Sequence, residues 1–93
     1  MMQAEHKPRT EAMLALGMIE NMLTEASTVK EHAASAEVDL RAISDIKARL
    51  EANPRDPSSI QWLKQVAQTW SPKLRQHAIR FRRVYDYLAV AGK

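Results

Sequence analysis

Residues 12–23 of the chain read AMLALGMIENML. Placed on a helix, the apolar side chains of this stretch point to nearly every side rather than to one face. A helix that is apolar all round has to be buried all round. This stretch therefore decides the fold, because either the rest of the chain surrounds it or another molecule does.

The residues that follow allow two ways of covering residues 12–23. Apolar positions at three- and four-residue spacing continue to Ala52, which predicts one long helix over about residues 10–52. A helix of that length carries residues 12–23 beyond the reach of the remaining chain, so we then expect a homodimer. Its interface is expected to contain Met13, Leu16, Met18, Ile19, Met22 and Leu23.

The alternative is a kink or sharp bend within residues 27–36. This segment is rich in mediocre helix formers, namely Ser27, Thr28, Val29 and Ser35. A bend there would fold residues 12–23 into the core of a compact monomer.

Prolines predict where two shorter helices begin. Pro57 follows Asp56, a pair that suits the first helical position and its N-cap, and an overlapping capping box begins at Ser58. These signals predict a helix over about residues 57–70. Ser71 and Pro72 predict a third helix over about residues 72–91, and no segment has the pattern of a strand. We therefore expect a single all-α domain over residues 1–93, with the long helix packed antiparallel against the two shorter ones.

Charge is distributed unevenly along the chain. Residues 1–56 contain seven Lys and Arg against ten Asp and Glu, whereas residues 57–93 contain seven against one. The cations of the third helix are Lys73, Arg75, Arg80, Arg82 and Arg83. In the expected antiparallel register this helix lies beside residues 19–38, which hold four glutamates and one lysine, so part of its charge would be balanced there. The remainder would meet an acidic protein or the phosphates of a nucleic acid.

Candidates for chemistry are few. The chain has no cysteine, so disulfides and thiolate sites are excluded, and no glycine-rich loop could hold a phosphate. His32 and His77 fall nearly opposite each other in the expected register, and a metal shared with Glu31 or Glu37 is conceivable. Structural histidines are far more common, so we expect no metal, no cofactor and no enzymatic activity. Trp62 and Trp70 are expected to pack in the core rather than to stack on bases.

The function expected from the sequence is that of a non-enzymatic helical interaction protein, a small adaptor or regulator that binds another protein through helical surfaces. The alternative is a nucleic-acid-binding regulator that uses the basic C-terminal helix. Because no signal peptide and no long apolar run are visible, we expect a cytoplasmic protein without membrane contact.

Overall fold

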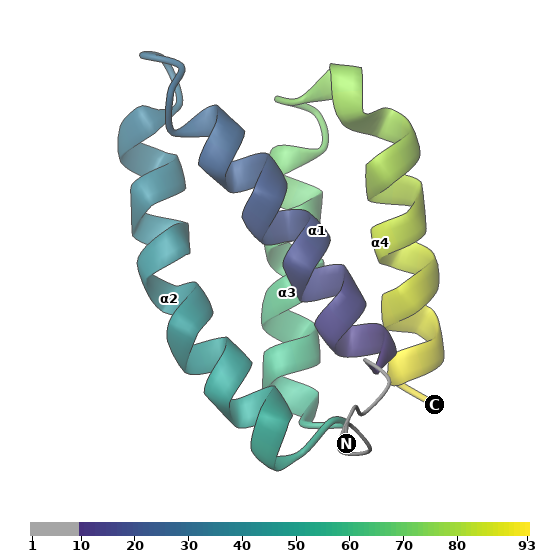
Figure 1. The fold of residues 1–93 in the computed structure, drawn as a ribbon. Helices are drawn as coiled ribbons and strands as arrows, with labels where there is room; N and C mark the ends of the chain where they lie inside the picture. Colours follow the sequence, from purple (N-terminus) through teal and green to yellow (C-terminus); the bar gives the residue numbers. More distant parts are fainter. Residues whose placement is uncertain (1–9) are drawn as a thin grey trace, which may run out of the picture.

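A computed structural model describes residues 10–93 and confirms the all-α class. Four α-helices follow one another along the chain: α1 (Glu11–Ala26), α2 (Ala33–Ala52), α3 (Pro57–Trp70) and α4 (Ala78–Ala91), with a short 3₁₀ turn, η1 (Arg75–His77), before α4. Successive helices run in opposite directions (Figure 1). Helix α1 crosses between α2 and α4 with α3 behind it, and it packs against all three.

The expected long helix over residues 10–52 is wrong, because the chain bends between α1 and α2. The alternative, a bend within residues 27–36, is confirmed, since residues 27–32 lie between the two helices. The hydroxyls of three residues, Thr24, Ser27 and Thr28, donate to backbone carbonyls in the last turns of α1. Those of Ser27 and Thr28 do so at 2.7 Å, to the carbonyls of Thr24 and Glu25. Side-chain donors of this kind compete with the helical backbone and satisfy carbonyls that a terminating helix leaves without partners.

The bend is favoured because it loses few backbone hydrogen bonds and allows the apolar side chains of α1 to be buried. Turn hydrogen bonds replace some of the helical ones, including those from the N–H of Val29 to the carbonyl of Ala26 and from the N–H of His32 to that of Val29. Each bond that is lost costs only about 1 kcal/mol net. In return, the large apolar side chains of α1 become buried, and each contributes about 1.5–3 kcal/mol. They are Leu16, Ile19, Met22 and Leu23, all at most 2% exposed.

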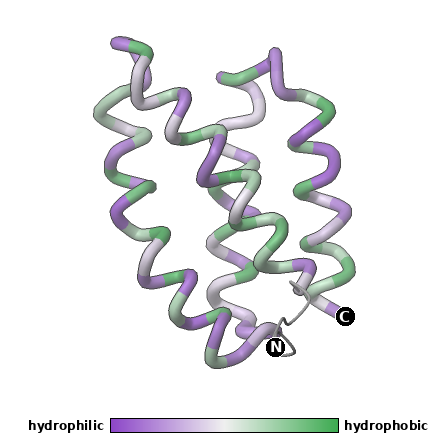
Figure 2. Tube along the Cα trace, viewed as in Figure 1, coloured by the Kyte–Doolittle hydropathy of each residue, from purple (hydrophilic) through white to green (hydrophobic). Residues whose placement is uncertain are grey.

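Every helix contributes to one hydrophobic core. Along the tube in Figure 2, hydrophobic and hydrophilic residues alternate in short stretches on each helix, as the three- and four-residue spacing requires. Opposite α1 the core contains Ile43 and Leu50 of α2, Leu63 and Trp70 of α3, and Val84 and Leu88 of α4. The buried side of residues 12–23 is thus covered by three helices of their own chain, while Met13 and Met18 are only partly buried.

Helix α3 uses the first of its two overlapping start signals. Asp56 is the N-cap, Pro57 lies in the first turn, and the Asp56 carboxylate accepts hydrogen bonds from the backbone N–H and the hydroxyl of Ser59. Ser59 is fully buried, and its hydroxyl is satisfied by this contact. The Ser59 hydroxyl bond is the main reason why the pKa of Asp56 lies below its ordinary value of 3.8, and Ser58 adds to the effect.

The expected start of the third helix at residue 72 is also wrong. After Trp70 the chain turns, and Leu74 adopts φ −118° and ψ 59°, which is not helical. This conformation directs Leu74 into the core, where it is 3% exposed. The α-helix then begins only at Ala78, after the 3₁₀ turn. Burial of one leucine therefore overrides the start signal of Ser71 and Pro72.

Loss of the Asp56 carboxylate should remove a pH-dependent part of the stability. Because the pKa of Asp56 is depressed in the folded state, its stabilising effect is fully present above the unfolded value near 3.9 and is lost as the pH falls through the lower folded value. Asp56→Asn keeps an N-cap acceptor but cannot titrate. We expect its thermal midpoint, followed by circular dichroism, to lie below that of the wild type at about pH 6 and to converge with it as the pH falls through the lowered pKa of Asp56. A difference that stays constant over this range would contradict the role of the carboxylate.

Candidate functional site

One candidate site is the group of cations on η1 and α4 and the turn before them. We call it the basic surface, and it consists of Lys73, Arg75, Arg80, Arg82 and Arg83. All five residues are exposed. The buried side of α4, formed by Phe81, Val84 and Leu88, faces the core, so the three arginines of α4 lie around the opposite side of the helix.

The expected balancing of this charge by an acidic neighbour occurs at one carboxylate. Glu25 of α1 lies 3.1 Å from Nε2 of His77 and 3.6 Å from Nη1 of Arg80. Within residues 10–93, the other four residues of the basic surface have no carboxylate oxygen within 4.0 Å. The reason is the bend: α4 packs along α1 instead of along residues 19–38 of a continuous helix, so Glu31 and Glu37 are carried away from it.

Two apolar side chains stand out on the same side of α4. Ile79 is 78% exposed and Val90 is 50% exposed. Ile79, Arg83 and Val90 follow a spacing of four and seven residues, which places them on one stripe of the helix. This stripe was not predicted from the sequence. The signal was available, because Ile79 lies off the apolar seam of the third helix and between arginines.

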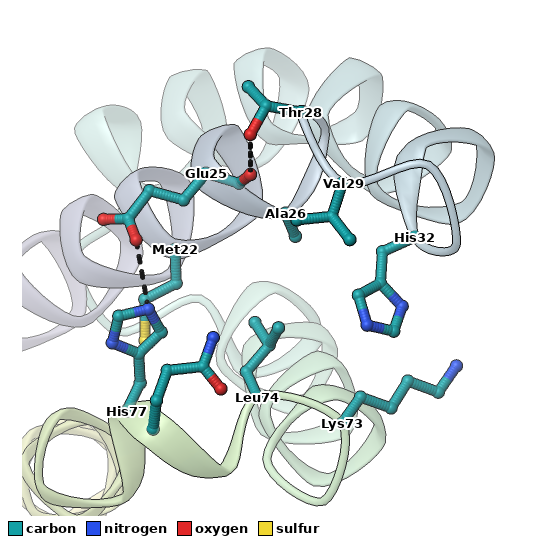
Figure 3. Close-up of a pocket in the computed structure, with 10 residues that line it drawn as sticks. Met22, Glu25, Ala26, Thr28, Val29, His32, Lys73, Leu74 and His77 are labelled. Carbon is teal, nitrogen blue, oxygen red and sulfur yellow. Dashed lines mark hydrogen bonds and ion pairs between the residues drawn. The ribbon is translucent and has the colours of Figure 1, made fainter.

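The second candidate site is a pocket of about 380 Å³ at the end of the molecule where the bend meets the α3–α4 connection. We call it the loop pocket; its lining residues are Met22, Glu25, Ala26, Thr28, Val29, His32, Lys73, Leu74, Gln76 and His77. Figure 3 shows His32 and Lys73 on one side, His77 and Glu25 on the other, and Leu74 and Val29 between them. This pocket was not predicted from the sequence, since its residues come from two segments, 22–32 and 73–77, that are more than forty positions apart.

Trp70 supports one side of the loop pocket. Its indole is 1% exposed, and its Nε1–H donates to the carboxylate of Asp39 on α2 at 2.7 Å. The ring of His32 packs edge-on against the indole at a centroid distance of 5.6 Å, and Nζ of Lys73 lies 5.2 Å from the ring centre. Trp70 is therefore a structural anchor that positions His32 and Lys73, and its buried ring is not free to stack on a base. Trp62 is partly buried against the core.

The two histidines reach the same pocket but not a shared metal site. His77 contacts Glu25, whereas His32 packs on Trp70, so the expected register that set the two rings opposite each other is not the one adopted. Within residues 10–93 no group of three His, Asp or Glu side chains is arranged to hold a metal ion.

The residues expected at a homodimer interface fall into two groups. Leu16, Ile19, Met22 and Leu23 are buried in the core of their own chain, whereas Met13 and Met18 are only partly buried. The interface was inferred from a continuous helix that could not be covered internally. The bend removes that argument, because α2, α3 and α4 cover α1.

Replacing the acceptor of the Trp70 hydrogen bond should destabilise the fold. Asp39→Ala leaves the buried indole N–H without a partner, which is expected to lower the free energy of unfolding by about 1–3 kcal/mol. Asp45→Ala is the matched control on the same helix, since Asp45 only forms an exposed pair with Arg49 and should cost at most about 1 kcal/mol. Urea denaturation followed by tryptophan fluorescence measures both. Equal effects of the two variants would show that the buried hydrogen bond contributes nothing specific.

Comparisons of the chain with protein-family models, with curated proteins and with solved structures found no match. None of the helices within residues 10–93 combines the length and the apolar character that a membrane span requires. What the chain binds must therefore be inferred from the two sites described above.

Proposed function

We propose that this chain is a non-enzymatic helical interaction protein, a small adaptor or regulator, that binds an acidic surface of another protein through the outer side of α4. The observation that carries the proposal is the position of Ile79. This isoleucine is 78% exposed, with Arg75, Arg82 and Arg83 three or four residues away along the chain. An apolar centre surrounded by cations is what an interface with an acidic protein requires.

The composition of this side of α4 supports a protein partner. Arginine is enriched in protein–protein interfaces, whereas lysine is depleted, and four of the five cations of the basic surface are arginines. The arginine side chains that lack a carboxylate partner within residues 10–93 can form bidentate hydrogen bonds with carboxylates of the partner. Ile79 and Val90 would contribute buried apolar area in the same contact.

Nucleic acid is the second candidate, and the same uncompensated cations favour it. Phosphates would be met by the arginines without any base being read. Two observations count against it. Exposed Ile79 and Val90 gain nothing from a phosphate backbone, and Trp70 is buried, so it offers no surface for base stacking.

The two candidates respond differently to Ile79→Ala and to salt. Proteins crosslinked to the chain in cells would be identified, and the dissociation constant of the most enriched one measured directly. For an acidic protein partner we expect Ile79→Ala and Arg83→Ala each to weaken binding about tenfold. Val38→Ala is the matched control, because Val38 is an exposed apolar residue on α2, and it should leave the affinity unchanged.

A nucleic-acid complex should instead depend strongly on salt and not on Ile79. A 20-base-pair duplex held by four cations should lose affinity on the order of a hundredfold between 50 and 200 mM salt, and Arg83→Ala should reduce the logarithmic slope by about 0.9. Ile79→Ala should have no effect on such a complex. Duplex binding with this salt dependence, together with no protein partner that depends on Ile79, would overturn the proposal.

Self-association remains a separate prediction. Its interface on α1 would be smaller than the one expected from the sequence. The outer side of α1 still offers the partly exposed Met13, Leu14, Gly17 and Met18. If two copies meet there, Met18→Asp should halve the mass measured by light scattering while the circular dichroism spectrum is unchanged. Leu16→Ala should instead lower the free energy of unfolding by about 2–5 kcal/mol, since Leu16 lies in the core of its own chain. A native mass equal to that of one chain would end the dimer prediction.

A further inference from the structure

We propose that the loop pocket binds a small amphipathic carboxylate, a molecule with one anionic head and an unbranched apolar tail. Such a ligand would be separate from the macromolecular partner proposed for α4. The inference rests on three properties of the pocket: its volume, its apolar floor and the state of the polar groups at its rim.

The volume and the floor suit a small apolar group. The pocket encloses about 380 Å³, which lies within the roughly 300–1,000 Å³ typical of small-molecule sites. Met22, Ala26 and Leu74 are buried residues that line it, and Val29 is 40% exposed beside them. These four side chains come from α1, the bend and the α3–α4 connection, and Figure 3 shows Leu74 and Val29 facing each other across the middle. An alkyl tail placed there would remove apolar surface from water on both sides.

The polar groups at the rim favour an anion over a cation. Lys73 has no carboxylate oxygen within 4.0 Å in residues 10–93, and it is held near the pocket by its contact with the Trp70 ring. His32 packs on the same ring, and its nitrogens have no hydrogen-bond partner in that part of the chain. The lysine ammonium and an imidazole N–H can therefore both donate to a carboxylate that enters on this side.

The carboxylate that lines the pocket is already engaged. Glu25, the only carboxylate among the lining residues, lies on the opposite side and contacts His77 and Arg80. Asp39 accepts the indole N–H of Trp70 from α2 and is not a lining residue. A cationic ligand would therefore find no uncommitted carboxylate in the pocket, whereas an anionic head on the side of Lys73 finds a cation.

The test uses hexanoate, octanoate and hexylamine as probes, with amide chemical shifts of the full chain as the readout. We expect hexanoate to bind with a dissociation constant on the order of millimolar and to shift the amides of Val29, His32, Leu74 and His77. Octanoate should bind about tenfold more tightly, because two further methylenes enter an apolar floor. Hexylamine, which carries the opposite charge on a tail of similar length, should cause no saturable shift.

Three variants distinguish binding in the loop pocket from a general attraction of anions to surface cations. Lys73→Met keeps the aliphatic stem and removes the charge, and it should weaken octanoate about fivefold. Val29→Asp puts a charge into the floor at an exposed position and should abolish binding. Arg83→Met is the matched control, because it removes the same charge from the far side of α4; it tests the proposed partner surface but should leave octanoate binding unchanged.

Three outcomes would overturn the inference. They are equal binding of hexanoate and octanoate, equal effects of Lys73→Met and Arg83→Met, and shifts spread over α4 instead of the two connections. The first would show binding of the carboxylate alone, and the other two would show attraction to surface charge. None of these results bears on the partner proposed for α4, whose test depends on Ile79.

Discussion

The structure depends on the need to cover α1 on three sides. This helix has apolar side chains in nearly every direction, and no single neighbouring helix can bury them. The bend after Ala26 solves the problem within one chain, because it places α2 on one side of α1 while α3 and α4 cover the others. The bend also determines where the charges fall. Within residues 10–93, Glu25 is the carboxylate that pairs with His77 and Arg80, and the other four cations of the basic surface form no ion pair.

The same constraint explains why the loop pocket lies where it does. The bend and the α3–α4 connection meet at one end of the molecule, where the helices they join have ended. Regular helix packing cannot fill the space between two turns, so the space is lined by side chains that the turns direct inward, Val29 from one and Leu74 from the other. Trp70, at the end of α3, contacts the lining residues His32 and Lys73, and its own N–H is tied to Asp39 on α2. The candidate binding site is thus a consequence of how the core helix is covered.

Much of the local structure could be predicted from the sequence, whereas the tertiary choices could not. The all-α class follows from apolar spacing, and the start of α3 follows from the pair Asp56-Pro57, because both are short-range signals. The bend after Ala26 is decided by small local preferences of Ser27 and Thr28 against several kcal/mol of burial along α1. To predict which of the two effects is larger, one has to know which helices are available to cover α1. The loop pocket and the pairing of Glu25 with His77 depend on the register that results, so a one-dimensional pattern contained no signal for them.

The first turn of α1 and the last turn of α4 lie at the same end of the molecule, opposite the loop pocket (Figure 1). Arg55 in the α2–α3 turn holds the carbonyl of Lys93 at that end through a 2.9 Å hydrogen bond. Helix termini that lie close together and on the surface tolerate being joined by a linker. We therefore expect a circular permutant, in which a linker joins α4 to α1 and the chain is opened at another connection, to keep the same helix packing. A fluorescent domain fused to residue 93 would likewise stand clear of the pocket.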